Sequence, residues 1–129
     1  MSRILVVDDE PDIAVMLKFM FERDGHAVTI AHNGLEALAA LGLEPRDASK
    51  PAPDLAILDV MMPELDGYAV CARMGDDPRT SAVAVVMLTA KGDMRALHDR
   101  APNVAAHVDK PFDADVLREM IAGMLGSRD

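Results

Sequence analysis

The sequence predicts an α/β protein, a doubly wound, five-stranded parallel sheet with helices on both faces. Five short apolar runs alternate along the chain with segments whose apolar residues recur every third or fourth position, the spacing of an amphipathic helix. The clearest runs, residues 4–7 and 55–58, are continuously apolar, as expected of strands covered on both faces. A chain of 129 residues suits one compact domain, which we expect to span residues 1–129.

The first half of the chain supplies three strands and two helices. In order, we expect a strand at 4–7, a helix with apolar residues from Ile13 to Phe21, a strand at 27–31, a helix marked by Leu35, Leu38 and Leu41, and a strand at 55–58. Gly25 fits the end of the first helix, because glycine readily adopts the left-handed backbone that follows many helices. Asn33 and Gly34 open the second helix.

The second half supplies two further strands and three helices. In order, we expect a helix after Gly67 that carries Val70, Cys71 and Met74, a strand at 83–88, a short helix around Met94 and Leu97, a strand at 104–108, and a final helix. The final helix has Asp113 as its N-cap and Gly126 after its end. Its apolar stripe consists of Val116, Leu117, Met120, Ile121 and Met124.

The stretch from Gly42 to Pro53 fits neither pattern. It contains Pro45, Pro51 and Pro53 with polar residues between them, and so many prolines cannot continue a helix. We therefore expect a surface loop here.

The chain is acidic: 13 Lys and Arg residues against 22 Asp and Glu residues leave a formal net charge of −9. This excess argues against non-specific binding to nucleic acid or to anionic membranes, which both need basic patches. A single cysteine, Cys71, excludes an internal disulfide. No apolar run approaches the roughly 18 residues that span a bilayer, and none resembles a signal peptide, so we expect a cytoplasmic protein.

Polar residues stand where four of the expected strands end. Asp8 and Asp9 follow the first strand, Asp59 the third and Thr89 the fourth, and the fifth runs into Lys110. In an open α/β sheet, ligands bind outside the carboxyl ends of the strands. Taken singly, each residue has an ordinary explanation as a solvated loop acid, a turn residue, a strand end or an exposed lysine. Their placement at the ends of one set of strands favours a shared site.

The chemistry of this set indicates phosphoryl transfer. Three neighbouring carboxylates repel one another, and a hard divalent cation such as Mg²⁺ relieves that repulsion. Thr89 and Lys110 are then left as donors suited to a phosphoryl group. A carboxylate can itself be the nucleophile and form an aspartyl phosphate, with the metal and the lysine stabilising the transferring oxygens.

Four stretches in this order resemble the receiver domain of two-component response regulators. They are residues 4–10 (ILVVDDE), 58–63 (LDVMMP) with Asp66 and Gly67, 88–90 (LTA), and 109–112 (DKPF). The resemblance covers essentially the whole chain and implies a flavodoxin-like strand order, 2-1-3-4-5. It also implies a phosphorylation switch that receives its phosphoryl group from a histidine kinase or a histidine phosphotransfer protein and acts on a downstream protein.

The resemblance also implies roles for single residues. Asp59 is expected to be the phosphoacceptor and a ligand of Mg²⁺, with Asp9 as a direct ligand, Asp8 acting mainly through a water, and the backbone carbonyl of Met61 completing the protein ligands. Thr89 is expected to bond a phosphoryl oxygen and Lys110 to pair with the phosphoryl group. The peptide bond between Lys110 and Pro111 is expected to be cis.

The chain departs from the family pattern at three places. His107 stands where the family usually has Tyr or Phe, residues 100–103 (RAPN) replace a usual Gly-Ala, and the 42–53 loop is longer than usual. The aromatic side chain at the first position normally turns inward with the hydroxyl at position 89. We hypothesise that His107 takes this switch role and that switching weakens at low pH, because burying a charged imidazole costs desolvation.

The sequence thus favours a stand-alone receiver, a signalling phosphoacceptor whose only catalysis is its own phosphorylation and dephosphorylation. One alternative is a receiver-like module that binds a partner without being phosphorylated. A second is a metal-dependent phosphatase with an aspartyl nucleophile. Such enzymes commonly need an acid two positions after the nucleophile, where this chain has Met61.

Overall fold

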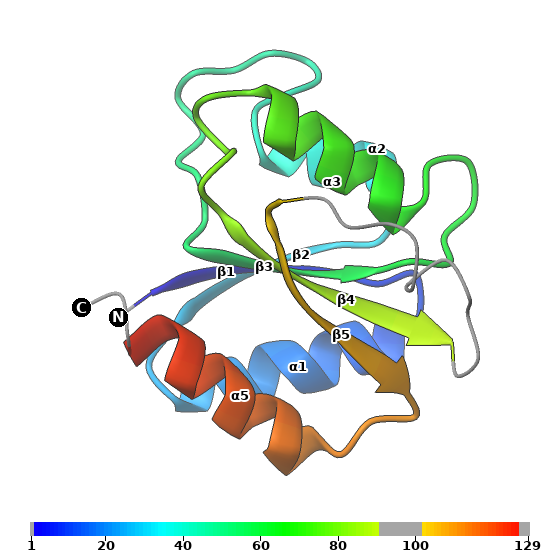
Figure 1. Cartoon of the computed structure of the whole chain (residues 1–129), viewed down its shortest axis with the longest axis vertical. Coiled ribbons are helices and arrows are strands. Elements are labelled where there is room, and N and C mark those ends of the chain that lie inside the picture. The colour runs from blue at the N-terminus through cyan, green and yellow to red at the C-terminus, as the bar shows by residue number, and fades with distance from the viewer. Residues whose placement is uncertain (1, 91–101, 127–129) are drawn as a thin grey trace.

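The computed structural model describes residues 2–90 and 102–126 and shows a single parallel sheet of five strands in the order β2-β1-β3-β4-β5. The strands are β1 (Arg3–Val7), β2 (Ala27–Ala31), β3 (Leu55–Asp59), β4 (Ala84–Ala90) and β5 (Val104–Lys110). The helices within these residues are α1 (Pro11–Arg23), α2 (Gly34–Ala40), α3 (Gly67–Asp76) and α5 (Ala114–Gly126). In Figure 1, α1 and α5 cover one face and α2 and α3 the other. The predicted fold class and strand order are confirmed.

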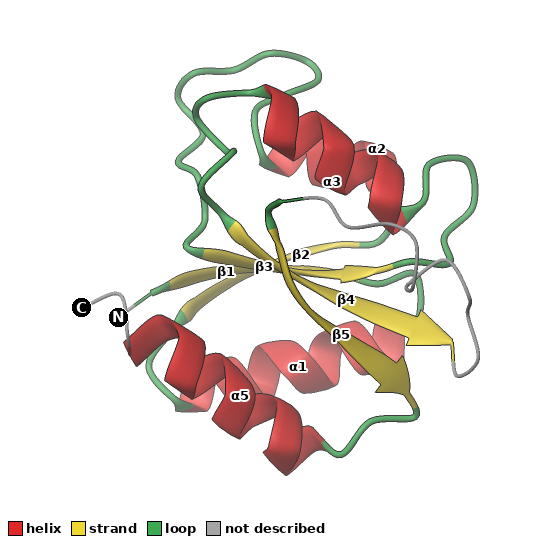
Figure 2. Cartoon of the chain, viewed as in Figure 1, coloured by secondary structure: helices red, strands yellow, loops and turns green. Residues whose placement is uncertain are grey.

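The sheet is the central layer between two layers of helices (Figure 2), and an apolar core fills the space on each of its faces. Successive residues of β1 point to opposite faces, so Leu5 and Val7 join the core under α2 and α3, whereas Ile4 and Val6 join the core under α1 and α5. All five residues of β3 are buried, as expected of a strand covered on both faces.

The helix ends largely follow the predicted capping residues. The side chain of Asp113 accepts a hydrogen bond from the backbone N–H of Asp115 at 2.9 Å, so this predicted N-cap is confirmed. Asn33, expected with Gly34 to open the second helix, caps α2 by accepting a hydrogen bond from the backbone N–H of Glu36 at 2.8 Å. Gly25 follows α1 with a φ of 90°, in the left-handed region that favours glycine. Gly126, expected beyond the last helix, is its final residue.

The prediction that three residues belong to the buried helical stripes is wrong. Met16, within the predicted stripe from Ile13 to Phe21, is 42% exposed, Leu35 is 53% exposed and Val116 is 59% exposed. Each residue of an α-helix turns by about 100°, and all three side chains fall about a quarter-turn or more away from the buried stripe of their helix, which in α1 runs through Ala14, Leu17 and Phe21. That stripe runs through Ala37 and Leu38 in α2 and through Leu117, Ile121 and Leu125 in α5. The helix predicted around Met94 and Leu97 lies outside the described residues.

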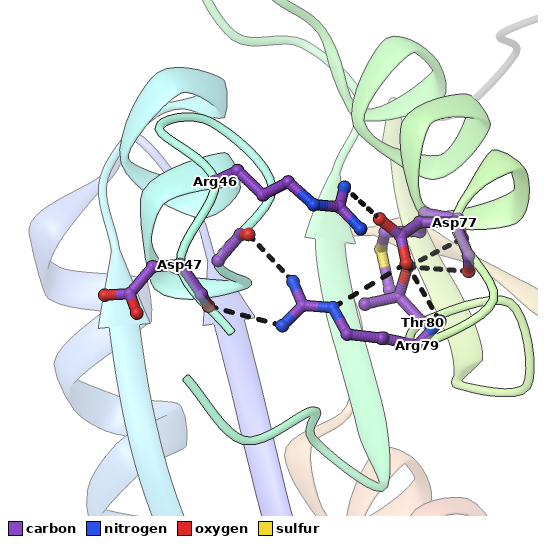
Figure 3. A network of polar contacts seen from close by, with 7 residues as sticks. Arg46, Asp47, Asp77, Arg79 and Thr80 are labelled. Atoms are coloured by element: carbon purple, nitrogen blue, oxygen red, sulfur yellow. Dashed lines mark hydrogen bonds and ion pairs between the residues drawn. The ribbon is translucent and has the colours of Figure 1, made fainter. Parts of the chain in front are cut away.

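The 42–53 segment is a loop, as predicted, and a network of polar contacts ties it to the turn after α3 (Figure 3). The guanidinium of Arg79 donates to the carbonyl oxygens of Gly42 at 2.8 Å and of Asp47 at 3.2 Å. Asp77, whose side chain is 10% exposed, pairs with Arg79 and accepts a hydrogen bond from Arg46 at 3.0 Å. Gly42 has a φ of 72°, and a Cβ there would collide with the carbonyl of Asp47. Arg79 therefore anchors the loop.

Replacing Arg79 tests this anchoring. We expect Arg79→Ala to lower the free energy of unfolding by about 1–3 kcal/mol, because it leaves the carbonyl oxygens of Gly42 and Asp47 without this donor and removes the ion pair with Asp77. The matched control is Arg46→Ala, which removes an arginine that is 69% exposed from the same carboxylate and should cost less than about 1 kcal/mol. Urea denaturation measures both. Equal losses for the two variants would contradict the anchoring role of Arg79.

Candidate functional site

The five residues that the sequence predicts to share a site all lie at the carboxyl edge of the sheet. Asp8 and Asp9 directly follow β1, Asp59 ends β3, Thr89 is the penultimate residue of β4 and Lys110 ends β5. A cleft of about 630 Å³ opens at this edge. Its lining includes Asp9, Asp59, Met61, Ala90, Lys110 and Phe112.

Lys110 is the positive centre of the cleft. Its Nζ atom lies 3.1 Å from Asp8 Oδ2, 3.3 Å from Asp59 Oδ2 and 3.3 Å from Glu10 Oε1. Burial alone lowers the pKa of Lys110, but the hydrogen bond to Asp8 and the charge of Asp59 outweigh burial and raise that pKa above its ordinary value. Lys110 therefore keeps its positive charge and holds three carboxylates that come from two distant parts of the chain.

The side chain of Lys110 crosses the fourth strand to reach these partners. β4 lies between β5 and β3, and Ala90 of β4 is the register partner of Lys110 in β5. Ala90 presents only a methyl group and lines the cleft beside Lys110. The small side chain leaves room for the lysine. The peptide bond that follows Lys110 is cis, as predicted.

Asp8 and Asp9 differ sharply in their surroundings. Asp8 is fully buried, and both of its oxygens have partners: Oδ2 meets Lys110, and Oδ1 accepts a hydrogen bond from the backbone N–H of Glu10 at 2.9 Å. Asp9 is exposed and lines the cleft. Asp9 is therefore the carboxylate that is open to an incoming ligand.

Asp59 lies at the base of the cluster and is 3% exposed. Burial, followed by the charge of Asp8, raises the pKa of Asp59 to about 7, although Lys110 opposes both. One Asp59 oxygen also accepts a hydrogen bond from the backbone N–H of Met61 at 3.3 Å. Gly67 lets α3 begin against this residue, because a Cβ there would lie 2.5 Å from the Asp59 carbonyl oxygen.

Thr89 reaches the predicted edge, but its hydroxyl is held outside the acidic cluster. It is 1% exposed and donates a hydrogen bond to Asp109 Oδ1 at 2.9 Å. The two residues are direct partners in the register of β4 and β5. The structure thus places Thr89 where the sequence predicts it and shows a partner that the sequence did not indicate.

His107 faces α3 from β5. Its imidazole is half-buried, and its centroid lies 6.4 Å from that of the Tyr68 ring. The Nε2 atom of His107 is buried without a hydrogen-bond partner in the described part of the chain. The predicted switch role of this residue stays a prediction.

Three further residues shape the site or its surroundings although the sequence reasoning gave them no role. Glu10 pairs with Lys110, and Asp109 holds Thr89. Asn103, in a stretch that departs from the family pattern, binds the start of β5 to α3 through the carbonyl and thiol of Cys71, at 3.2 and 3.3 Å. Asp109 gave no sequence signal, because its contact with Thr89 depends on the register between β4 and β5. Glu10 gave only the weak signal of a third consecutive acid.

The donor set suits a hard divalent cation. Carboxylate oxygens of Asp8, Asp9 and Glu10 lie within 4.8 Å of one another, and the Asp59 carboxyl is close enough for its pKa to respond to Asp8 and Asp9. Oxygen ligands with excess negative charge are those that Mg²⁺ prefers. The repulsion that raises the pKa of Asp59 is the strain that such a cation relieves.

A doubly wound sheet with an acidic cluster and a lysine at its carboxyl edge defines a receiver-type α/β domain. The model of the response regulator receiver domain matches residues 4–122, and the chain belongs to this family. Members of the family act as phosphoacceptor switches in two-component systems. No helix in the described part of the chain has the length and apolar character needed to cross a membrane.

Curated relatives and solved structures agree with this assignment. The chain is 31% identical to the protein PilH of Pseudomonas aeruginosa over 97% of this chain and 98% of that one. It is 32% identical to the DNA-binding dual master transcriptional regulator RpaA of Synechocystis sp., and it spans about half the length of that protein and of several other relatives. The signal receiver domain of a signal transduction histidine kinase from Syntrophus aciditrophicus is similar in structure, with a TM-score of 0.82, 32% identity and coverage of 98% and 92%.

The raised pKa of Asp59 predicts an unusual effect of its removal. Without metal, the unfolded chain ionises Asp59 near 3.8 whereas the folded domain keeps it protonated up to about 7, so the free energy of unfolding falls as the pH rises through this window. Asp59→Asn avoids this loss. In EDTA at pH 8 we expect the variant to be more stable than the wild type by about 2–4 kcal/mol, with the difference shrinking toward pH 4. Urea denaturation of both proteins at several pH values measures this difference. If the stability advantage of Asp59→Asn over the wild type is no larger at pH 8 than at pH 4, the expectation is contradicted.

Proposed function

We propose that this chain is the phosphoacceptor switch of a two-component phosphorelay, with Asp59 as the residue that takes the phosphoryl group from a histidine kinase or a histidine phosphotransfer protein. One observation carries the assignment. The nearly buried carboxylate of Asp59 has the ammonium of Lys110 at 3.3 Å and opens into a cleft beside the exposed Asp9. A buried nucleophile with a fixed positive charge beside it suits transfer of an anionic group.

In the proposed reaction, an Asp59 oxygen forms a bond to phosphorus as the bond from phosphorus to the donor's imidazole nitrogen breaks. Lys110 lies where it can pair with the oxygens of the transferring group, whose charge it offsets. The product keeps its acyl phosphate until water attacks phosphorus and regenerates the carboxylate. Met61, two positions after Asp59, has no acid–base group, which disfavours the phosphatase alternative.

Mg²⁺ is the proposed cofactor, held by Asp9, Asp59, the backbone carbonyl of Met61 and, mainly through water, Asp8. When bound, it offsets the negative charge on the phosphoryl oxygens. The geometry supports this division of roles, because Asp9 is exposed whereas Asp8 already has partners on both oxygens.

Thr89 and His107 are the proposed switch residues. Both lie on strands at the β5 edge of the sheet, Thr89 beside the cleft and His107 next to α3. A phosphoryl group on Asp59 adds about 1.5 to 2 negative charges. This charge attracts the Thr89 hydroxyl, and the space that Thr89 leaves is the proposed cause of movement at His107.

Phosphorylation should occur on Asp59 and at no other carboxylate. With a small phosphodonor such as acetyl phosphate and Mg²⁺, intact mass spectrometry should show one added phosphoryl group on the wild type and none on Asp59→Asn. The matched control is Asp76→Asn, an exposed acid of α3, which should be labelled like the wild type. Labelling that persists in Asp59→Asn would overturn the assignment.

The metal site should depend on Asp9 more than on Asp8. We expect Asp9→Asn to weaken Mg²⁺ binding by more than about tenfold and Asp8→Asn to weaken it less, because Asp9 is exposed in the cleft whereas both oxygens of Asp8 are held by Lys110 and Glu10. Isothermal titration calorimetry measures both affinities. If the loss at Asp8 exceeds the loss at Asp9, the two roles are assigned the wrong way round.

A further inference from the structure

The hydrogen bond between Thr89 and Asp109 has a direct chemical consequence. A threonine hydroxyl carries one proton, so it can donate to only one acceptor at a time. In this structure Asp109 Oδ1 takes that proton at 2.9 Å. The proposed function needs the same proton for an oxygen of the phosphoryl group on Asp59.

We propose that Asp109 is a positioning residue that holds the Thr89 hydroxyl away from the phosphoryl site and competes with the phosphoryl group for its proton. The inference rests on the proposed function and adds to it a resting-state acceptor. By this account Asp109 sets how readily phosphorylation draws Thr89 inward, and its loss makes the phosphorylated arrangement easier to reach.

The backbone arrangement suits such an exchange. Thr89 and Asp109 are register partners in neighbouring parallel strands, and the register continues through Ala90 and Lys110. Their backbones are thus fixed relative to each other, and rotation about the χ1 bond of Thr89 is enough to break the hydrogen bond to Asp109 without a movement of either strand.

The solvent exposure of Thr89 and Asp109 determines how easily the Thr89 hydroxyl exchanges Asp109 for a phosphoryl oxygen. Thr89 is 1% exposed, so its hydroxyl cannot turn to solvent and needs a protein or phosphoryl acceptor. Asp109 is exposed, so its carboxylate is rehydrated when the hydroxyl leaves. The hydrogen bond to a charged carboxylate is strong enough to hold the Thr89 hydroxyl in the resting state. When that hydrogen bond breaks, water replaces the hydroxyl at the carboxylate, so its loss costs little free energy.

Beryllofluoride, a non-covalent mimic of the phosphoryl group, tests the competition on the whole chain. With saturating Mg²⁺, its affinity is measured by ¹⁹F NMR for the wild type, Asp109→Ala, Asp109→Asn, Thr89→Ala and the double variant Thr89→Ala with Asp109→Ala. We expect Asp109→Ala to bind about 3- to 10-fold more tightly than the wild type. Asp109→Asn keeps an acceptor oxygen without the charge and should gain less. The Mg²⁺ affinity of the two Asp109 variants, measured without beryllofluoride, should stay within about twofold of the wild-type value.

The double variant separates competition for the proton from a general charge effect. If Asp109 acts through Thr89, adding Asp109→Ala to Thr89→Ala should change the affinity by less than about twofold. An equal gain in both backgrounds, or no gain in the wild-type background, overturns the proposal. Glu119→Gln, which removes an exposed acid of α5, is the matched control and should not tighten binding. A wild type that does not bind beryllofluoride at all would instead overturn the proposed function.

Discussion

The contact of one ammonium group with three carboxylates is the interaction on which the rest of this site depends. Lys110 is 102 residues from Asp8 in the chain, yet their charged atoms are 3.1 Å apart. The strand order brings them together, because it places β1 beside β3 and leaves only β4 between β3 and β5. Without Lys110, Asp8 and Asp59 would be buried acids with no opposing charge, which is costly for any folded domain.

The position of Asp59 between its neighbours gives the site its chemical character. Burial and the charge of Asp8 disfavour the ionised carboxylate, whereas Lys110 favours it, and the pKa of Asp59 is raised to about 7. A cation that offsets the acidic cluster would favour the ionised form of Asp59. In the proposed function, this links metal binding to the reactivity of the proposed phosphoacceptor.

Much of this organisation could be predicted from the sequence, because strand ends and helix stripes are local patterns. The positions of Asp8, Asp59 and Lys110 follow from apolar runs that stop at a polar residue. The partner of Thr89 could not be predicted in the same way, because it depends on the register between β4 and β5. The exposure of Leu35 and the anchoring of the 42–53 loop by Arg79 likewise depend on tertiary packing.

Reductive trapping of the acyl phosphate would test the central claim most directly. Borohydride converts a phosphorylated aspartate to homoserine, and peptide mass spectrometry then identifies the modified position without any substitution in the protein. After incubation with a small phosphodonor and Mg²⁺, the account predicts homoserine at position 59 and at no other acidic residue. Homoserine at Asp8 or Asp9, or none under conditions where the intact protein gains a phosphoryl group, would contradict it.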